Sequence, residues 1–283
     1  MSEILDYSCY KHLLVIVPHQ DDEILLCAGL IYEFLKAQKK VTVCVVTNGD
    51  FECKDYSKGR GRLCETLAGL ALLGVEQENI IFLGYADTGM AREDSFLMKL
   101  YEASNGEEIY PSITSNKTYG LEEKEDFHFL CYGEHGGYNR NTLMTDLREV
   151  FLRRNPDVIV TTHGSDLHGD HEALFYFVSE ILSNIEKKER PQLLVGIVHS
   201  TEGDEEWPKR EGKKYTCPKG LEETGLSWEE RLILPLSKEL RGGKRKGNLK
   251  YEALLKYKIA LEPGAIDYLM SFIKEEEIFW KIS

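Results

Sequence analysis

The sequence predicts one α/β domain in which helices flank a mostly parallel β-sheet. Short apolar or β-branched runs, typical of buried parallel strands, alternate with longer segments whose apolar residues recur at helical spacing. In addition, no repeat, low-complexity tract or clean linker divides the 283 residues. We therefore expect a single domain over 1–283, with a core at about 10–200, a rim insertion at about 200–248 and C-terminal helices at 249–280.

The first part of the chain supplies three predicted strands and two predicted helices. The strands are expected at 12–17, 41–47 and 79–83, and the helices at 23–37 and 60–73. The first strand is an apolar run ended by Pro18, the second is β-branched, and Gly74 is a stop signal for the second helix. This order of elements is typical of parallel sheets, in which helices connect successive strands.

The alternation of strands and helices resumes in the second part of the chain. We expect strands at 127–132, 158–161 and 193–199, and helices at 141–154, 169–186, 249–260 and 265–275. Two long segments, 84–140 and 200–248, break the rhythm. Long irregular segments in a compact domain are usually functional lids or disordered, so we expect these two to form the rim of a site.

Composition and charge limit the classes of function. The net charge of −13 argues against a protein that binds nucleic acid or anionic membranes. The chain has no apolar run of transmembrane length, and its polar, acidic start does not resemble a signal peptide. Seven cysteines without a Cys-x-x-Cys pair favour a reduced, cytoplasmic compartment. We therefore expect a cytoplasmic protein, and the sequence is compatible with a homo-oligomer.

A histidine and three carboxylates follow the first predicted strand. The segment is Pro18-His-Gln-Asp-Asp-Glu23, and in open α/β sheets ligands bind where strands end in this way. Adjacent carboxylates repel one another unless a cation is present. His19 and Asp22 are suitable zinc ligands, which leaves Asp21 free to take a proton. The alternative interpretation is an ordinary acidic helix start with an Asp N-cap.

A second polar cluster, His163-Gly-Ser-Asp-Leu-His-Gly-Asp-His171, follows the strand predicted at 158–161. Any one of these residues alone is explained by a polar loop and a helix N-cap, but three of the chain's eight histidines fall here. Catalytic zinc has three protein ligands and an open position, so one residue of this cluster would complete the site. His163, His168 and His171 are all candidates by spacing. The same ligand types also accept iron(II) or cobalt(II).

These motifs resemble those of the LmbE-like, or PIG-L, family of zinc-dependent N-deacetylases. The family's Pro/Ala-His-Pro-Asp-Asp-Glu stands at 18–23 with Gln20 in place of proline. Its His-Pro-Asp-His stands at 168–171 with Gly169 in place of proline. Weaker similarities are Arg62-x-x-Glu65, Gly84-Tyr-Ala-Asp87 and the closing Glu277-Ile-Phe-Trp280. The segment 200–248 resembles the family least.

The resemblance implies a Rossmann-like fold and a role for each matching residue. The ligands that it implies for one zinc ion are His19, Asp22 and His171. Asp21 would be the general base. His168 would act as electrophile or general acid, oriented by Asp170. Arg62 would contact the substrate, and Asp87 is a further candidate for substrate binding from its loop position.

Three further features outside the two motifs are candidate parts of a site. His135 lies in a glycine-rich loop that we assign to the substrate rim, although a surface turn explains it equally well. His199 ends a predicted strand and either faces the site or packs against its neighbours. The basic run at 238–246 is better explained as a solvated loop than as a phosphate-binding segment.

The function that we expect is removal of the N-acetyl group from an N-acetylglucosamine-type sugar or sugar conjugate. The partner would thus be a small sugar-containing substrate. The first alternative is an amidase of the same family that acts on a thiol conjugate or an antibiotic intermediate. The second is a non-catalytic sugar- or nucleotide-binding module, although no Gly-x-Gly-x-x-Gly follows the first strand. The sequence also lacks the Gly-x-Ser-x-Gly of a serine hydrolase.

Overall fold

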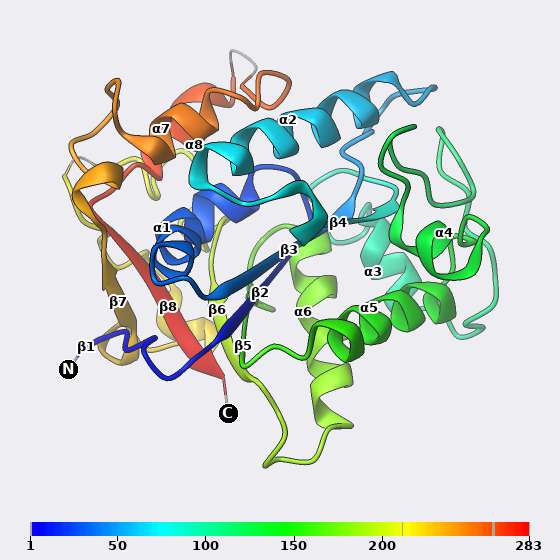
Figure 1. Cartoon of the computed structure of the whole chain (residues 1–283), viewed down its shortest axis with the longest axis horizontal. Coiled ribbons are helices and arrows are strands. Elements are labelled where there is room, and N and C mark those ends of the chain that lie inside the picture. Colours follow the sequence, from blue (N-terminus) through cyan, green and yellow to red (C-terminus); the bar gives the residue numbers. More distant parts are fainter. Residues whose placement is uncertain (1, 211, 262–263, 283) are drawn as a thin grey trace.

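A mixed, mostly parallel β-sheet runs through the centre of the computed structural model, which describes residues 2–210, 212–261 and 264–282 (Figure 1). The strands are β1 (Glu3–Ile4), β2 (His12–Val17), β3 (Lys40–Thr47), β4 (Ile80–Tyr85), β5 (Val158–Thr162), β6 (Gln192–Gly196), β7 (Leu232–Pro235) and β8 (Glu276–Ile282). Their order in the sheet is β1-β7-β8-β6-β5-β2-β3-β4. Only β8 runs antiparallel to its neighbours among these strands. The predicted fold class is therefore confirmed.

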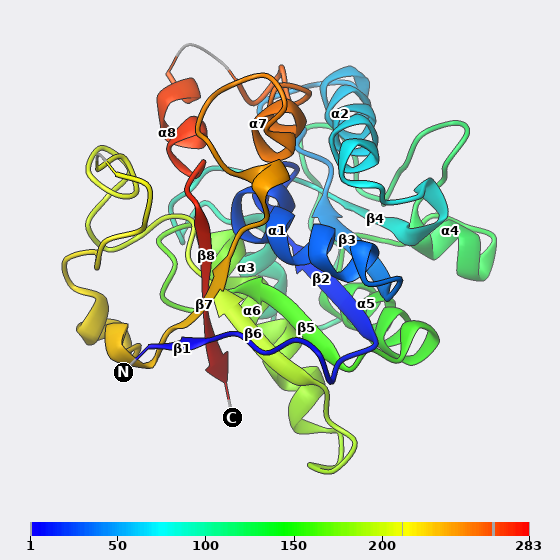
Figure 2. The ribbon, with the colours of Figure 1, turned by 60° about the vertical axis from the view of Figure 1, so that its left-hand side comes forward.

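Helices cover both faces of this sheet (Figures 1 and 2). They are α1 (Asp22–Lys36), α2 (Ser57–Leu73), α3 (Phe96–Tyr101), α4 (Phe127–Tyr132), α5 (Arg140–Arg154), α6 (Gly169–Ser183), α7 (Leu249–Leu254) and α8 (Ile266–Ser271). α1, α2, α7 and α8 lie on one side of the sheet, and α3, α5 and α6 lie on the other. None of the helices in the described part of the chain is both long and apolar enough to cross a bilayer.

Strand β2 is the centre of the core and sets the position of the first motif. Its residues from Leu13 to Val17 are fully buried, as expected for a parallel strand covered on both faces. Leu13 aligns with Val41 of β3 on one side and with Val158 of β5 on the other. The chain continues from β3 to β4 on one side of β2 and from β5 to β6 on the other. The crevice between β2 and β5 is therefore the switch point where such sheets bind ligands.

Two segments differ from the sequence-based prediction. Residues 127–132 form α4 rather than a strand, because the Asp126 side chain caps the helix at the Phe129 N–H and Gly133 ends it in a left-handed conformation. Residues 276–282 form β8 rather than the end of a helical region, because this strand lies between β6 and β7. The two helices that precede β8 are also shorter than predicted. The helix caps determine the structure of 127–132, and pairing with β6 and β7 determines that of 276–282, rather than the local sequence pattern.

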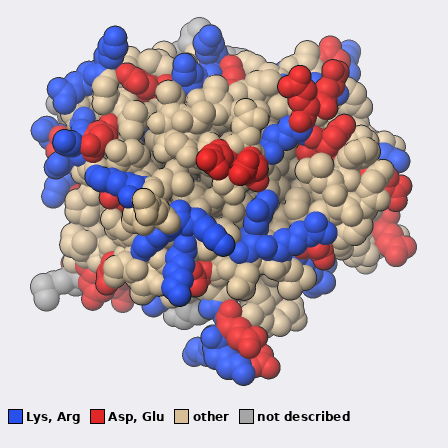
Figure 3. Space-filling model, in the orientation of Figure 1, with Lys and Arg blue, Asp and Glu red and all other residues tan. Residues whose placement is uncertain are grey.

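Charged side chains are unevenly distributed over the surface. The face turned to the viewer in Figure 1 carries Lys and Arg side chains gathered near its middle, with Asp and Glu around them (Figure 3). A cavity at the amino ends of β2 and β3 is lined by Lys11, Lys39, Lys40 and Arg154. The net charge of −13 is therefore an average over a surface that includes a basic region. This region lies at the opposite end of the strands from the two polar motifs.

Candidate active site

The two polar motifs meet at the carboxyl ends of β2 and β5. The first motif leaves β2 at Pro18 and passes into α1 through a tight turn, and the second joins β5 to α6. Asp21 in that turn has a φ of 105°, a conformation that costs energy for a residue other than glycine. Such strain persists where the surroundings enforce it, and it often marks functional sites. The predicted convergence of the two motifs is therefore what the fold brings about.

Three potential ligand atoms converge in the crevice. His19 Nδ1 lies 3.1 Å from His171 Nε2 and 3.4 Å from Asp22 Oδ2, and His171 Nε2 lies 3.3 Å from the same carboxylate oxygen. In a tetrahedral site with bonds of about 2.0–2.1 Å, ligand atoms are about 3.3–3.4 Å apart. The three side chains are at most 9% exposed. Two imidazoles and one carboxylate at this spacing therefore fit a zinc ion.

The charge balance of the cluster also favours a cation. Burial acts against protonation of His19, yet Asp87, Asp170 and Asp22 together hold the pKa of its ring well above the usual value. Burial likewise opposes ionisation of Asp22, but the pKa of this carboxyl is held well below the usual value by His171 and His19. The cluster thus requires positive charge among its carboxylates. A bound metal ion would supply that charge in place of the imidazole protons.

Carboxylates outside the triad orient the two histidines. Asp166 Oδ2 lies 3.2 Å from His171 Nδ1. Asp170 Oδ2 and Asp87 Oδ1 each lie 3.2 Å from His19 Nε2. Metal-binding histidines commonly have a carboxylate at the second ring nitrogen, which fixes the tautomer and the ring orientation. The arrangement differs from the expectation for Asp170, whose carboxylate faces His19 and accepts hydrogen bonds from Ser95 and from the Leu97 N–H rather than orienting His168.

His168 stands beside the triad as a neutral imidazole. Its Nδ1 accepts a hydrogen bond from the Asp170 N–H at 3.2 Å and caps helix α6. Burial, together with the neighbouring His19 and His171, holds the pKa of His168 far below its usual value. A neutral ring whose Nδ1 is an acceptor must carry its proton on Nε2. His168 can therefore donate a hydrogen bond to a negatively charged oxygen.

Asp21 lies beside the triad and is held by Arg62 from α2. Arg62 Nη2 donates to the Gln20 carbonyl at 2.7 Å and lies 3.5 Å from Asp21 Oδ2, while Nη1 lies 3.5 Å from Asp87. Burial raises the pKa of Asp21 to about 7, and Arg62 opposes this shift. A carboxylate in this setting is suited to take a proton. Arg62 lines the same cavity as Asp21, so it could reach a substrate while it holds this carboxylate.

Both departures from the family motifs have a structural reason. The Gln20 side chain donates to the Thr47 carbonyl at 2.6 Å and ties the first motif to the end of β3. Gly169 donates its N–H to the Met90 carbonyl at 2.8 Å, which proline could not do. A Cβ at Gly169 would lie 2.6 Å from Ser95 Cβ, so glycine permits this close approach. Each spacer residue thus fixes its loop by a hydrogen bond of its own.

A buried ion pair supports helix α1 behind the first motif. The helix is interrupted at Cys27, whose φ and ψ are −145° and 27°. Glu277 of β8 accepts hydrogen bonds from the Gly29 and Leu30 N–H groups at 2.8 and 3.1 Å. Lys250 of α7 donates to the Leu25 carbonyl at 2.8 Å and to Glu277 at 3.0 Å. These bonds satisfy backbone groups that the interruption would otherwise leave unpaired.

A second buried contact reaches the first motif from the end of the chain. Tyr257 donates to Glu23 at 2.5 Å, and the other Glu23 oxygen accepts from the Asp21 N–H at 3.0 Å. Burial raises the pKa of Glu23 to about 8. Glu23, held by Tyr257, therefore fixes the strained Asp21 turn through the Asp21 N–H. The sequence carried no signal for the contacts of Tyr257, Lys250 and Glu277 with the first motif and α1, because these partners lie more than two hundred residues away.

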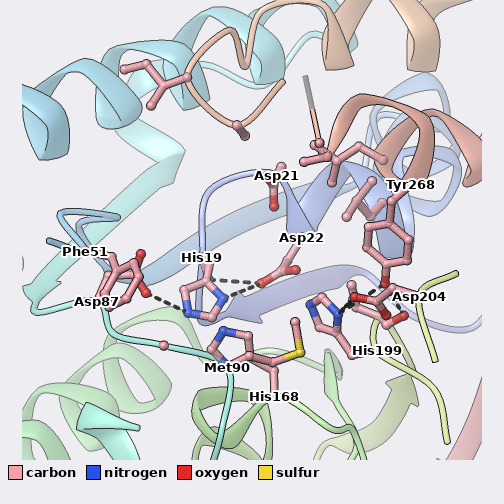
Figure 4. A pocket seen from close by; sticks show the side chains of 18 of the residues that line it. His19, Asp21, Asp22, Phe51, Asp87, Met90, His168, His199, Asp204 and Tyr268 are labelled. Atoms are coloured by element: carbon pink, nitrogen blue, oxygen red, sulfur yellow. Dashed lines mark hydrogen bonds and ion pairs between the residues drawn. The ribbon is translucent and has the colours of Figure 1, made fainter. Parts of the chain in front are cut away.

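A cavity of about 470 Å³ opens above the cluster (Figure 4). His19, Asp21, Asp22, Arg62, Asp87 and His168 line it together. His171 lies below, in contact with the other ligands. The lining also includes Val198, His199, Asp204, Lys209, Tyr268 and Leu269, of which the sequence pointed only to His199.

Three sequence-based candidates lie elsewhere. His135 is not among the described residues that line the cavity; it bonds Asp126 at 2.5 Å, so its assignment to the substrate rim is not supported by its position. His163 packs against Phe175 and is not brought to the ligand triad. The basic run at 238–246 is largely exposed and likewise lies outside the cavity lining in the described part of the chain.

Solved structures of three deacetylases share the fold. The N,N'-diacetylchitobiose deacetylase from Pyrococcus horikoshii superposes with a TM-score of 0.57 at 14% identity, covering 98% of this chain and 85% of that one. The A40926 pseudoaglycone deacetylase Dbv21 gives 0.56 at 15%, covering 96% of each chain. The zinc-inhibited form of teicoplanin deacetylase Orf2 gives 0.56 at 14%, covering 95% and 97%. At these identities the likeness establishes the fold alone.

The sequence itself matches a family model. No curated protein gives a significant match to the chain. The model described as PIG-L, GlcNAc-PI de-N-acetylase, matches residues 14–182. This segment is more than half of the chain and contains both polar motifs, including all the residues whose side chains form the ligand triad. The chain therefore belongs to the PIG-L family of de-N-acetylases.

Proposed function

We propose that the protein is a zinc-dependent hydrolase that removes the N-acetyl group from an N-acetylglucosamine-type sugar or sugar conjugate. The observation that carries this proposal is the triad of His19, Asp22 and His171, with ligand atoms 3.1–3.4 Å apart beside the buried Asp21. Membership of the PIG-L family supports amide hydrolysis as the reaction. Iron(II) and cobalt(II) suit the same ligands, so the metal is part of the proposal.

The metal would polarise the acetyl carbonyl and lower the pKa of a water molecule from about 16 toward about 7. Asp21 takes the proton from that water, and a general base of this kind contributes about 10²–10⁴-fold. Arg62 holds Asp21 in place at 3.5 Å. His168 donates from Nε2 to the oxygen that becomes negative as the water attacks, a contribution of roughly 10²–10³-fold.

The leaving nitrogen needs a proton before the amine departs. Asp21 has taken one from water, and His168 carries one on Nε2, so these two residues are the candidate donors. Both line the cavity close to the triad. If the neutral His168 gave up its Nε2 proton, its ring would become an anion. Proton transfer from Asp21 instead returns this residue to the carboxylate with which it began. We therefore favour Asp21 as the group that moves the proton from water to nitrogen.

The substrate class rests on the family and on the shape of the cavity. The description of the family model names a de-N-acetylase of an N-acetylglucosamine lipid, and one similar structure is named as a deacetylase of diacetylchitobiose. A second candidate is an amide in an antibiotic intermediate, since two similar structures are named for such deacetylases. A cavity of about 470 Å³ has room for a group larger than one acetylated sugar ring. An amidase acting on a thiol conjugate is a variant of this second candidate.

Metal removal and restoration test the proposal directly. The purified protein would be stripped with a chelator, assayed on N-acetylglucosamine conjugates, and assayed again after addition of zinc, iron(II) or cobalt(II). We expect release of acetate to be lost with the metal and recovered with zinc. Activity that is unaffected by chelation would refute the metal dependence. A protein that binds zinc but releases acetate from none of the acetylated sugars, while it cleaves an antibiotic intermediate, would favour the second candidate.

A further inference from the structure

His199 is the third imidazole among the described residues that line the cavity, and it lies beyond the segment matched by the family model. It follows β6, as His163 follows β5, and its side chain is 14% exposed. Its ring centroid lies 5.5 Å from that of His168 and 5.3 Å from that of His171. Figure 4 shows the ring between Asp204 on one side and Asp22 and His168 on the other. His199 thus lies beside His168 and His171 and lines the cavity with Asp21.

The surroundings of Nδ1 fix the state of this ring. Asp204 Oδ2 lies 2.8 Å from His199 Nδ1, and Tyr268 Oη lies 3.4 Å from it. Tyr268 donates its one hydroxyl hydrogen to the Val198 carbonyl at 2.6 Å, so its oxygen presents a lone pair to the ring. Both neighbours of Nδ1 are therefore acceptors, and Nδ1 must carry the hydrogen. In the neutral form of the ring, this tautomer leaves the lone pair on Nε2.

Stacking on one face of the His199 ring also holds it in place. Tyr268 stacks on it with a centroid distance of 5.4 Å and an angle of 20° between the planes. The N–H groups of Val198 and His199 both donate to Asp166, the carboxylate that lies behind His171. The position of the His199 ring is therefore tied to the ligand triad through one shared carboxylate. A residue fixed in this way is suited to select a substrate group rather than to adapt to it.

We infer that His199 binds the substrate by accepting a hydrogen bond from a hydroxyl group next to the acetamido carbon. This inference rests on the proposed function, because it assumes that the acetyl amide sits between the triad and Asp21. In a pyranose glycoside with a 2-acetamido group, the hydroxyl on the adjacent carbon is the 3-hydroxyl. A hydroxyl supplies the donor that a lone pair at Nε2 requires, whereas a carbonyl or carboxylate does not. His199 thus determines specificity for a hydroxylated ring.

A matched pair of variants separates the two nitrogens of the ring. His199→Asn keeps a polar group near Nδ1, where it can still meet Asp204, but removes the atom that faces the cavity. His199→Gln reaches as far as Nε2 and can accept there through its amide oxygen. Tyr268→Phe is a control that perturbs the Nδ1 side alone. Metal content of each variant, measured by elemental analysis, checks that the triad is intact.

The probes are methyl N-acetylglucosaminide and its 3-deoxy analogue. For the first, we expect His199→Asn to raise KM about three- to tenfold with little change in kcat, and His199→Gln to recover much of this loss. On the 3-deoxy analogue, we expect His199→Asn and the wild type to be nearly equal. An equal loss on both substrates, or a loss in kcat alone, would overturn the inference. A wild type that cleaves neither probe would instead count against the proposed function.

Discussion

The cavity has two walls that differ in origin and in construction. The catalytic wall, made of His19, Asp21, Asp22, Arg62, Asp87 and His168, comes entirely from the segment matched by the family model. The distal wall, made of Val198, His199, Asp204, Lys209, Tyr268 and Leu269, comes entirely from residues beyond it. The first carries the groups that the proposed reaction needs. The second is where this chain can differ from its relatives.

The walls also differ in how firmly their charges are held. The histidines and carboxylates of the catalytic wall are at most 9% exposed and are linked to one another by several polar contacts. In the distal wall, the side chains of Asp204 and Lys209 are about a quarter exposed. Buried polar networks are costly to disturb, whereas exposed charges are screened by solvent. We therefore expect substitutions in the catalytic wall to abolish the reaction and substitutions in the distal wall to tune substrate binding.

The largest effect is expected from loss of a ligand in the triad. His171→Ala would remove one of three protein ligands, so metal binding and turnover should both be lost. Asp166→Asn changes only the group behind His171 and should weaken metal binding by about 10–100-fold. Metal affinity measured by competition with a chelator would rank the two variants. Full zinc affinity in the His171→Ala variant would show that the catalytic wall is not built around this triad.

The next effect concerns the general base. Asp21→Asn keeps the size of the side chain but cannot take a proton, so kcat should fall by about 10²–10⁴-fold while zinc stays bound. Measuring kcat together with zinc content separates this role from that of Asp22. If Asp21→Asn lost the metal and Asp22→Asn kept it, the roles of the two neighbouring carboxylates would have to be exchanged.

The catalytic wall was largely predictable because its residues follow strands at fixed spacing. The convergence of 18–23 and 163–171 follows from two parallel strands ending at one edge of a sheet, and the structure places them there. Which histidine of the second motif faces His19 did not follow from spacing, because the direction of a side chain in a loop depends on packing. His163, for example, packs against Phe175. The resemblance to the family, rather than the residues alone, pointed to His171.

The rest of the site depends on contacts that leave no local pattern. Glu277 meets the Gly29 N–H across 248 positions and Lys250 meets the Leu25 carbonyl across 225. The acidic run that ends in Glu277 was assigned to a helical region, although in β8 this carboxylate points into the core to serve α1. The family resemblance implied that Asp170 orients His168, whereas its carboxylate lies at His19. Such pairings are fixed by tertiary packing alone.

Because α1 depends on these long-range contacts, we expect the catalytic wall to be unstable without the Lys250–Glu277 ion pair. Lys250→Met leaves Glu277 buried without its cation, so the free energy of unfolding should fall by about 3–5 kcal/mol. The double variant Lys250→Met, Glu277→Gln removes both charges while it keeps an acceptor for α1, and it should recover part of the loss. Urea denaturation followed by circular dichroism would measure both. A single variant as stable as the wild type would mean that the first motif does not need this support.

The smallest effect is expected at the rim of the distal wall. Lys209 lines the cavity, but its ammonium group pairs at 3.0 Å with Glu205, whose side chain is 92% exposed. An exposed ion pair contributes about 0–1 kcal/mol, so Lys209→Met should leave the unfolding midpoint nearly unchanged. Because the charge of Lys209 is already paired with Glu205, KM should change by less than about tenfold and kcat should stay constant, as steady-state kinetics on one acetylated sugar would measure. A large fall in kcat would place a charge of the distal wall in the reaction itself, and the division between a wall for chemistry and a wall for recognition would no longer hold.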